Sequence, residues 1–211
     1  MKYKAIIFDL DGVICSTDQY HYEAWKVIAD KLNIYFDKYI NHRLRGVSRM
    51  ESLNIILERY VGSLTDEEKQ KYAEQKNKIY RELLEKMNEA DVSSEVKNTL
   101  TELKQKGIML AIGSSSKNAK FILQRLGIMD YFDKISDGNN VVHSKPDPEV
   151  FLKASEYLQL KPEECLVIED SLAGIEAARL GNMDSVAIGD VTKSNLATYN
   201  ISSFSNILNI I

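Results

Sequence analysis

The feature that most limits how this chain can fold is a short apolar run followed by two closely spaced aspartates. Residues 4–8 (Lys-Ala-Ile-Ile-Phe) have the composition of a strand buried on both faces of a parallel sheet. Asp9 and Asp11 follow, and because residues two apart on extended backbone point to the same side, their carboxylates are expected to converge just beyond the strand. Open α/β sheets bind ligands at this edge, and two neighbouring carboxylates favour a hard cation such as Mg²⁺. A strand followed by an Asp-Gly hairpin turn would also fit these residues taken alone.

Composition limits the classes of partner. The chain has 211 residues, of which 44% are hydrophobic, and this is enough for a sizeable core. Its formal net charge of −4 argues against nucleic acid as the main partner, so an anionic substrate would have to be attracted by local cations. The N-terminal apolar run is too short for a signal peptide and no run approaches a membrane span, so we expect no membrane association. Cys15 and Cys165 lie far apart without metal-ligand spacing, which predicts two reduced thiols in a cytoplasmic protein.

Strand and helix patterns alternate near both ends of the chain, and only helical pattern fills the middle. Further apolar runs predict buried strands at residues 108–112, 165–168 and 183–188. From about residue 19 to residue 87 the pattern is helical, and it begins with the apolar stripe Ala24, Val27, Ile28 and Leu32. The pattern predicts an α/β fold, in which a doubly wound parallel-sheet core receives an inserted α-helical cap. We expect the core to comprise residues 1–15 and 90–211, and the cap residues 16–89.

Two arginines flank a predicted helix start within the cap. Ser48 and Glu51 form a capping-box pattern, which predicts a helix beginning there. Arg45 and Arg49 lie at this N-terminus, where the helix dipole disfavours cations. An anion bound at the backbone amides, which Gly46 leaves accessible, would resolve the conflict. The alternative is that both arginines project into water.

Two other cap residues, Lys76 and His21, each allow more than one interpretation. Lys76 falls on the apolar stripe of a helix predicted from about residue 66 to residue 87, so it either extends past the rim to water or reaches an internal anionic site. Its position alone favours the first interpretation. His21 and Trp25 share one edge of the first cap helix, which Thr17 or Asp18 could cap, and an ordinary histidine on a helix face is the plainer interpretation.

A glycine-serine loop follows the predicted strand at residues 108–112. A strand, such a loop and a helix N-terminus together form the geometry of a phosphate cradle. The polar residues of this segment are Ser114, Ser115, Ser116, Lys117 and Asn118. An ordinary serine-capped helix is the alternative.

Two later segments add a cation and two carboxylates at strand ends. Pro146 restricts Lys145 to extended backbone, and Asp147 is expected to cap a helix with Pro148 at its first position, so Lys145 would be a rigid cation beside the sheet. A solvent-exposed lysine is the alternative. Glu169 and Asp170 follow the predicted strand at residues 165–168 and would add oxygen ligands to those of the first strand.

Taken together and in order, these motifs resemble those of the haloacid dehalogenase-like superfamily. The four matching elements are Asp9-Leu10-Asp11-Gly12, Ser114, Lys145-Pro146 and Glu169-Asp170. Within the superfamily the chain is most similar to the β-phosphoglucomutase family. That similarity covers both expected domains and lies at residues 8–14, 20–21 with Trp25, 46–49, 76–77, 116–118, 144–146 and 169–171. Three positions depart from that family, in which a lysine stands at the position of Arg45, a smaller residue at that of Ser115 and an aspartate in the middle of the segment 15–17.

The resemblance implies a role for each candidate site residue. Asp9 would be the nucleophile and Asp11 the general acid and base, with His21 supporting Asp11. Ser114 and Lys145 would bind the transferring phosphoryl group. The residues expected to bind substrate are Trp25, Arg45, Gly46, Val47, Arg49, Lys76, Ser116, Lys117 and Asn118.

The resemblance also implies a cofactor and a reaction. One Mg²⁺ would be held by Asp9, the carbonyl of Asp11, Glu169 and Asp170, and β-glucose 1,6-bisphosphate would prime Asp9. The reaction would interconvert β-glucose 1-phosphate and glucose 6-phosphate in a monomer whose partners are small sugar phosphates, with no nucleic acid and no membrane. A sugar-phosphate phosphatase on the same scaffold and a non-catalytic phosphosugar-binding module are the alternatives.

Overall fold

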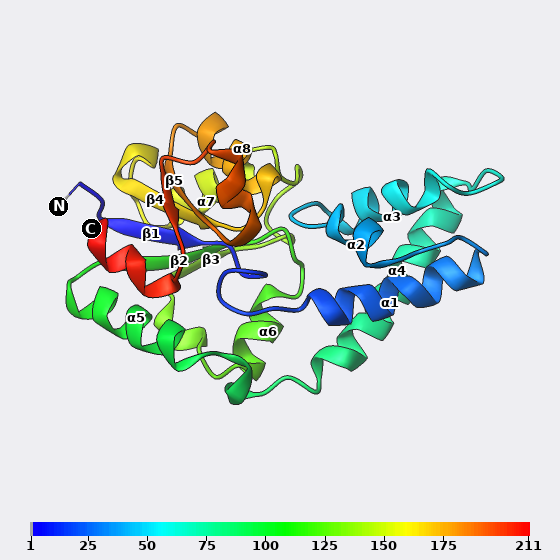
Figure 1. Cartoon of the computed structure of the whole chain (residues 1–211), viewed down its shortest axis with the longest axis horizontal. Coiled ribbons are helices and arrows are strands. Elements are labelled where there is room, and N and C mark those ends of the chain that lie inside the picture. The colour runs from blue at the N-terminus through cyan, green and yellow to red at the C-terminus, as the bar shows by residue number, and fades with distance from the viewer. Residues whose placement is uncertain (1) are drawn as a thin grey trace.

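A six-stranded parallel sheet is the centre of the computed structural model, which describes residues 2–211 (Figure 1). The strand order is β3-β2-β1-β4-β5-β6, and every neighbouring pair is parallel. The strands are β1 (Ala5–Phe8), β2 (Met109–Gly113), β3 (Lys134–Ser136), β4 (Cys165–Glu169), β5 (Asp184–Ile188) and β6 (Tyr199–Ile201). The strand order runs outward from β1 in both directions, which confirms the predicted doubly wound fold. Because β1 lies between β2 and β4, its carboxyl end is at the middle of the sheet edge.

Helices cover both faces of the sheet. Alternate residues of β1 point to opposite faces, and because all of them are apolar, each face is packed against its own group of helices. Ile6 and Phe8 pack with one group of elements, and Ala5 and Ile7 pack with the other. The first group comprises α5 (Ser94–Gln105), α6 (Ala119–Arg125) and the C-terminal 3₁₀ helix Phe204–Asn209. The second comprises α7 (Glu149–Tyr157) and α8 (Leu172–Leu180).

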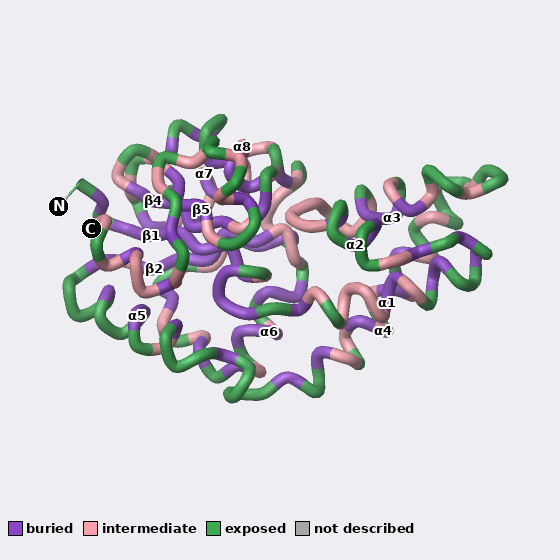
Figure 2. Tube along the Cα trace, in the orientation of Figure 1, coloured by how far each residue is buried: buried purple, intermediate pink, exposed green. Residues whose placement is uncertain are grey.

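The four helices that follow β1 form a separate body at one end of the molecule (right in Figure 1). They are α1 (Asp18–Lys31), α2 (Lys38–His42), α3 (Arg49–Leu57) and α4 (Asp66–Leu84). They bury an apolar cluster of their own around Trp25, Ile28 and Leu53, and Figure 2 shows buried segments in both bodies. Ser48 caps α3 as predicted, while a Thr65–Glu68 capping box begins α4. We refer to α1–α4 as the cap and to the sheet with its helices as the core.

Several predicted boundaries were wrong by one to three residues. α4 ends at Leu84 rather than Met87, and α7 begins at Glu149, so that Pro148 is its N-cap and not its first residue. Asp147 nevertheless accepts a hydrogen bond from the Glu149 backbone N–H. Strands β3 and β6 were not predicted, because runs of three residues carry too little periodicity.

Both cysteines are free, as predicted, and both are buried. Among residues 2–211, no helix is both long and apolar enough to pass through a bilayer.

Candidate active site

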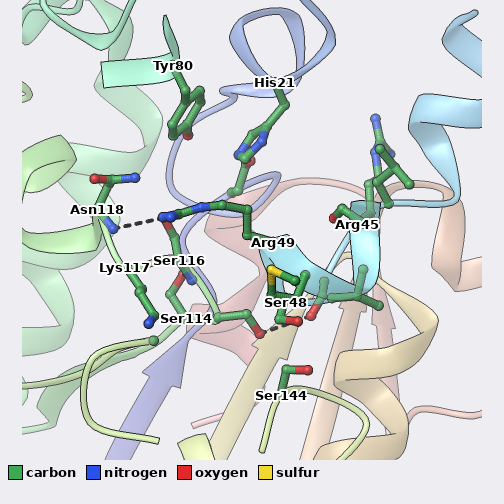
Figure 3. A pocket seen from close by; sticks show the side chains of 18 of the residues that line it. His21, Arg45, Ser48, Arg49, Tyr80, Ser114, Ser116, Lys117, Asn118 and Ser144 are labelled. Atoms are coloured by element: carbon green, nitrogen blue, oxygen red, sulfur yellow. Dashed lines mark hydrogen bonds and ion pairs between the residues drawn. The ribbon is translucent and has the colours of Figure 1, made fainter. Parts of the chain in front are cut away.

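The carboxyl ends of β1, β2 and β4 form the floor of a cavity whose roof is the cap. The cavity has a volume of about 390 Å³ and is lined from both bodies (Figure 3). It brings together almost every residue that the sequence predicted for the site, although these residues lie up to 161 positions apart in the chain: Asp9, Asp11, His21, Trp25, Arg45, Gly46, Val47, Arg49, Lys76, Ser114, Ser116, Lys117, Asn118 and Asp170. Lys145 and Glu169 do not line the cavity and lie beneath its floor.

A buried ion triad supports the floor. The Lys145 ammonium donates hydrogen bonds to Asp9 Oδ1 at 2.5 Å and to Glu169 Oε1 at 2.6 Å, and it is 1% exposed. The second Glu169 oxygen accepts from the backbone N–H and the hydroxyl of Ser171, at 2.7 and 2.9 Å. Although burial opposes it, the two carboxylates raise the pKa of Lys145, so this lysine stays charged. The alternative of a solvent-exposed Lys145 was therefore wrong.

Asp170 completes a group of oxygen atoms that suits a divalent cation. Gly12 has φ +90°, and a Cβ atom there would lie 2.1 Å from Asp170 Oδ2, so glycine is needed for this close approach. Burial, with Glu169 nearby, raises the pKa of Asp170 to about 8, and burial raises the pKa of Asp9 to about 7. Carboxylates that resist ionisation in the protein alone are stabilised by a bound cation.

The available oxygen atoms suit a Mg²⁺ site that is completed by water and substrate, rather than a metal site closed entirely by protein side chains. Among the residues described, no three His, Cys, Asp or Glu side chains are grouped closely enough to hold a metal by themselves. Mg²⁺ sites of phosphate-processing enzymes commonly use one or two carboxylates and are completed by water and substrate phosphate. Asp9, Asp170 and the Asp11 carbonyl are the available oxygens, whereas both oxygens of Glu169 already accept hydrogen bonds from protein groups. Direct ligation by Glu169 remains a prediction.

The Asp11 carboxylate is held at the junction between core and cap. Oδ1 accepts from the Thr17 backbone N–H at 2.7 Å and Oδ2 from the Thr17 hydroxyl at 2.5 Å. Tyr80 in turn donates to the Thr17 hydroxyl at 2.9 Å. Burial raises the pKa of Asp11, while the two bonds from Thr17 oppose the change. Thr17, one of the two predicted candidates, occupies the N-cap position of α1, but its side chain makes no capping hydrogen bond because its hydroxyl faces Asp11 instead.

His21 links Asp11 to Lys76. The His21 Nδ1 atom lies 2.8 Å from Lys76 Nζ, and Nε2 lies 3.6 Å from Asp11 Oδ2. A lysine ammonium can only donate, so Nδ1 accepts and Nε2 carries the proton directed at Asp11. Burial, with Lys76 nearby, lowers the pKa of His21 well below its usual value, which is consistent with a neutral ring.

Lys76 points inward, so the interpretation in which it extends to water was wrong. It is 2% exposed and its ammonium lies 5.0 Å from the Trp25 ring centre and 4.1 Å from that of Tyr80. Burial lowers the pKa of Lys76 well below its usual value, and nearby Arg49 adds to the effect. A buried cation over two aromatic faces, with no carboxylate within 4 Å in residues 2–211, has the surroundings of a ligand-binding group.

The arginines differ in their partners. Arg45 forms an ion pair with Asp18 and lies 4.0 Å from Asp170 Oδ2. Arg49 and Lys117, by contrast, have no carboxylate within ion-pair distance in the described chain. Burial lowers the pKa of Arg49, as expected of a guanidinium without a counterion. The cavity thus contains unpaired positive charge on both the cap and the core.

The loop after β2 has the form of a phosphate cradle. Ser114 is 3% exposed at the end of the strand, and its hydroxyl accepts from the backbone N–H of Ser116. The Ser116 hydroxyl accepts from the N–H of Asn118, which is the N-cap residue of α6. Asn118 also contacts the cap, since its amide donates to Asn77 and accepts from Arg81.

Asn41 and Ser52 are among the polar residues of the cavity wall that were not predicted. Both are buried residues of the cap. A lone asparagine on a short helix and a serine inside a longer one have no distinctive spacing, so no sequence signal identifies them.

The family model of haloacid dehalogenase-like hydrolases matches residues 3–182. A β-phosphoglucomutase of Bacillus subtilis (strain 168) is 43% identical over 189 residues, covering 88% of this chain and 83% of that protein. A phosphorylated carbohydrates phosphatase of Thermotoga maritima is 31% identical over 186 residues, covering 87% and 83%. The crystal structure of a β-phosphoglucomutase from Clostridium difficile superposes with a TM-score of 0.92 at 40% identity, covering 97% of this chain and 93% of that one.

The chain therefore belongs to the haloacid dehalogenase-like hydrolase family. Within that family it is similar both to sugar-phosphate mutases and to a phosphatase, with higher identity to the mutases described above.

Proposed function

We propose that this protein is a β-phosphoglucomutase that interconverts β-glucose 1-phosphate and glucose 6-phosphate. The observation that carries the proposal is the presence of two separate cationic groups on one cavity. Lys117, beside Ser114, belongs to the core, and Arg49 and Lys76 belong to the cap. A ligand with a phosphate at each end can bind both cationic groups at once, whereas a monophosphate needs only the group on the core.

The chemistry follows from the positions of Asp9 and Asp11. In the first transfer, the 6-hydroxyl oxygen of β-glucose 1-phosphate attacks the phosphorus of phosphorylated Asp9, the bond from phosphorus to Asp9 breaks, and Asp11 accepts the hydroxyl proton. The product, β-glucose 1,6-bisphosphate, turns end for end. Asp9 then attacks the phosphorus at C1, and Asp11 returns its proton to the departing sugar oxygen. Burial raises the pKa of Asp11, which suits a group that must carry a proton between two steps.

The remaining core residues bind and orient. Ser114 and Lys145 would hold the transferring phosphoryl group, and His21 would orient Asp11. Asp9, Asp170 and the Asp11 carbonyl, with Glu169 behind them, would hold one Mg²⁺, which when bound neutralises phosphate oxygens and keeps Asp9 ionised. We expect the enzyme to act as a monomer on sugar phosphates, in a cytoplasm where its two free thiols stay reduced.

A sugar-phosphate phosphatase is the second candidate, because the Thermotoga maritima relative carries that name. It would use the same Asp9 and the same floor, and would differ only in letting water attack the phosphorylated aspartate.

One assay separates the two candidates. Enzyme primed with β-glucose 1,6-bisphosphate is incubated with β-glucose 1-phosphate, and glucose 6-phosphate and free phosphate are measured together. We expect isomerisation to be slow before priming and to exceed phosphate release after it, and we expect Asp11→Asn to reduce the flux severely even when primed. Phosphate release equal to substrate loss would identify a phosphatase.

A further inference from the structure

The cap touches the core directly beside the phosphate loop. The Ser115 hydroxyl donates a hydrogen bond to the backbone carbonyl of Gly46 at 2.9 Å, across 69 positions of sequence. Ser115 follows Ser114 on the core, and Gly46 lies three residues before Arg49 on the cap. The bond therefore joins the loop beneath one end of the ligand to the segment that carries a cation for the other end.

The same segment of the cap lies in close contact with a second core residue. Gly46 has φ +76°, and a Cβ atom at that position would lie 2.6 Å from the Ser171 hydroxyl oxygen and 3.2 Å from the Ser171 Cβ. Any side chain would both strain the backbone and push the segment away from the core. Ser171 in turn binds Glu169 beneath the floor. The Ser115 bond is thus made where the cap backbone rests directly on the residues that support the floor.

This contact differs from the other hydrogen bonds between cap and core. Asn118 binds Asn77 and Arg81 on helix α4, and Asp11 accepts hydrogen bonds from Thr17 at the start of α1. Both lie near the points where the chain passes between the two bodies. The Ser115 bond instead involves the segment that leads into α3, so among these it is the one that restrains the substrate-binding segment itself.

We propose that Ser115 is a positioning residue that, through Gly46, keeps the cap on the core and so directs phosphorylated Asp9 to a sugar hydroxyl rather than to water. This inference rests on the proposed function. In transfer to a sugar and in hydrolysis alike, an oxygen atom attacks the phosphorus, the bond to Asp9 breaks and Asp11 accepts the proton. The outcome therefore depends on whether a sugar hydroxyl or a water molecule reaches the phosphorylated Asp9. Water enters when the cap lifts, whereas a bisphosphate that is turning over must be retained.

The contribution of one hydrogen bond sets the expected size of the effect. Loss of a neutral, half-buried hydrogen bond changes an equilibrium by about two- to tenfold. Ser115→Ala should therefore raise the fraction of turnovers that release free phosphate by about this factor. Ser115→Thr retains the hydroxyl and should restore the wild-type ratio.

Ser194→Ala is a matched control. The Ser194 hydroxyl also donates to a backbone carbonyl, that of Val191 at 2.7 Å, but both residues belong to the core and lie outside the cavity. This variant should leave the ratio of free phosphate to glucose 6-phosphate unchanged.

A distance measurement tests the contact without relying on catalysis. Spin labels are attached at Val61→Cys on the cap and Leu180→Cys on the core, which are 99% and 50% exposed in the native protein. The native cysteines are 8% and 0% exposed, so the labels should attach selectively. In the ligand-free protein, Ser115→Ala should broaden the distance distribution, while Ser115→Thr and Ser194→Ala should leave it as in the wild type.

The two measurements separate failure of the contact from failure of the proposed function. Unchanged label distances in Ser115→Ala would refute the inference, whatever the activity. Unchanged distances together with an unchanged phosphate ratio would refute it on both counts. If the wild type releases phosphate in proportion to substrate loss, the proposed mutase function is wrong, and the label distances still decide whether Ser115 holds the cap.

Discussion

Replacing Lys76 with methionine should make the ligand-free protein more stable and the active site less effective. The Lys76 ammonium is 2% exposed and has one hydrogen-bond partner, His21 Nδ1 at 2.8 Å. No carboxylate lies within ion-pair distance of it in residues 2–211. Methionine has a similar length and no charge, so Lys76→Met removes the cost of burying the cation while filling the same space.

The structure sets the magnitude of this change. Burying an ammonium costs several kcal/mol. The rings of Trp25 and Tyr80, at 5.0 and 4.1 Å, return about 0.5–2 kcal/mol. The bond to His21 returns about 1.5–3 kcal/mol more. We therefore expect Lys76→Met to raise the free energy of unfolding by about 1–4 kcal/mol at pH 7, the stabilisation seen when buried ion pairs are replaced by apolar residues.

The pH dependence gives a second readout. Burial lowers the native pKa of Lys76 below its usual value of 10.5, so between the lowered pKa and 10.5 the unfolded chain binds more protons than the native protein. Wild-type stability should therefore increase as pH rises through this window, because the destabilising charge is lost from the native state. The advantage of Lys76→Met should be largest at pH 7 and should shrink toward pH 10.

Urea unfolding of ligand-free protein at pH 7 and pH 9.5 measures both effects, and calorimetry measures the affinity for β-glucose 1-phosphate. Lys78→Met, an exposed position on the same helix, is the control and should change stability little. We expect the affinity of Lys76→Met to fall about tenfold to one hundredfold, as for loss of a charged hydrogen bond. If Lys76→Met is less stable than the wild type and the difference does not vary with pH, then Lys76 is a structural residue and the reasoning is wrong.

Three further predictions address the floor, the cation and the cap. Lys145→Ala should lower the free energy of unfolding by about 3–5 kcal/mol, because Asp9 and Glu169 would become buried charges without a partner; an unchanged urea midpoint would contradict the triad. Excess chelator should abolish turnover and Mg²⁺ restore it, and Asp170→Asn should weaken Mg²⁺ binding while the circular dichroism spectrum is retained; full activity in chelator would refute the metal site. Because burial raises the pKa of Asp170 to about 8, calorimetric Mg²⁺ affinity should increase from pH 6 to pH 8 as protons cease to compete. Arg49→Ala should slow conversion of the bisphosphate more than phosphorylation of Asp9, and a flux equal to wild type would show that Arg49 is only a surface residue.

Much of the core was predictable because its information is local. The run before Asp9 is apolar at every position since β1 is covered on both faces, and such a run is recognisable wherever it occurs in a sequence. Parallel strands place their carboxyl ends at one edge, so Asp9, Ser114 and Asp170 could be assigned to one site before any contact was known. The strands β3 and β6 could not be predicted, because their pairing partners lie elsewhere in the chain and determine their conformation.

The fold class, the order of the motifs and the identities of the groups that can carry phosphoryl chemistry were all predictable from the amino-acid sequence. The directions of the ambiguous side chains became known only from the packing of the folded chain. Lys76 could have reached water along its helix, and it turns inward because Trp25, Tyr80 and His21 surround it from two cap helices. Likewise, Thr17 could have capped α1, and it binds Asp11 because the chain turns from core to cap at that point. Local periodicity specifies which face of an element a residue occupies, but the partners that meet that face come from distant segments, and only their packing reveals them.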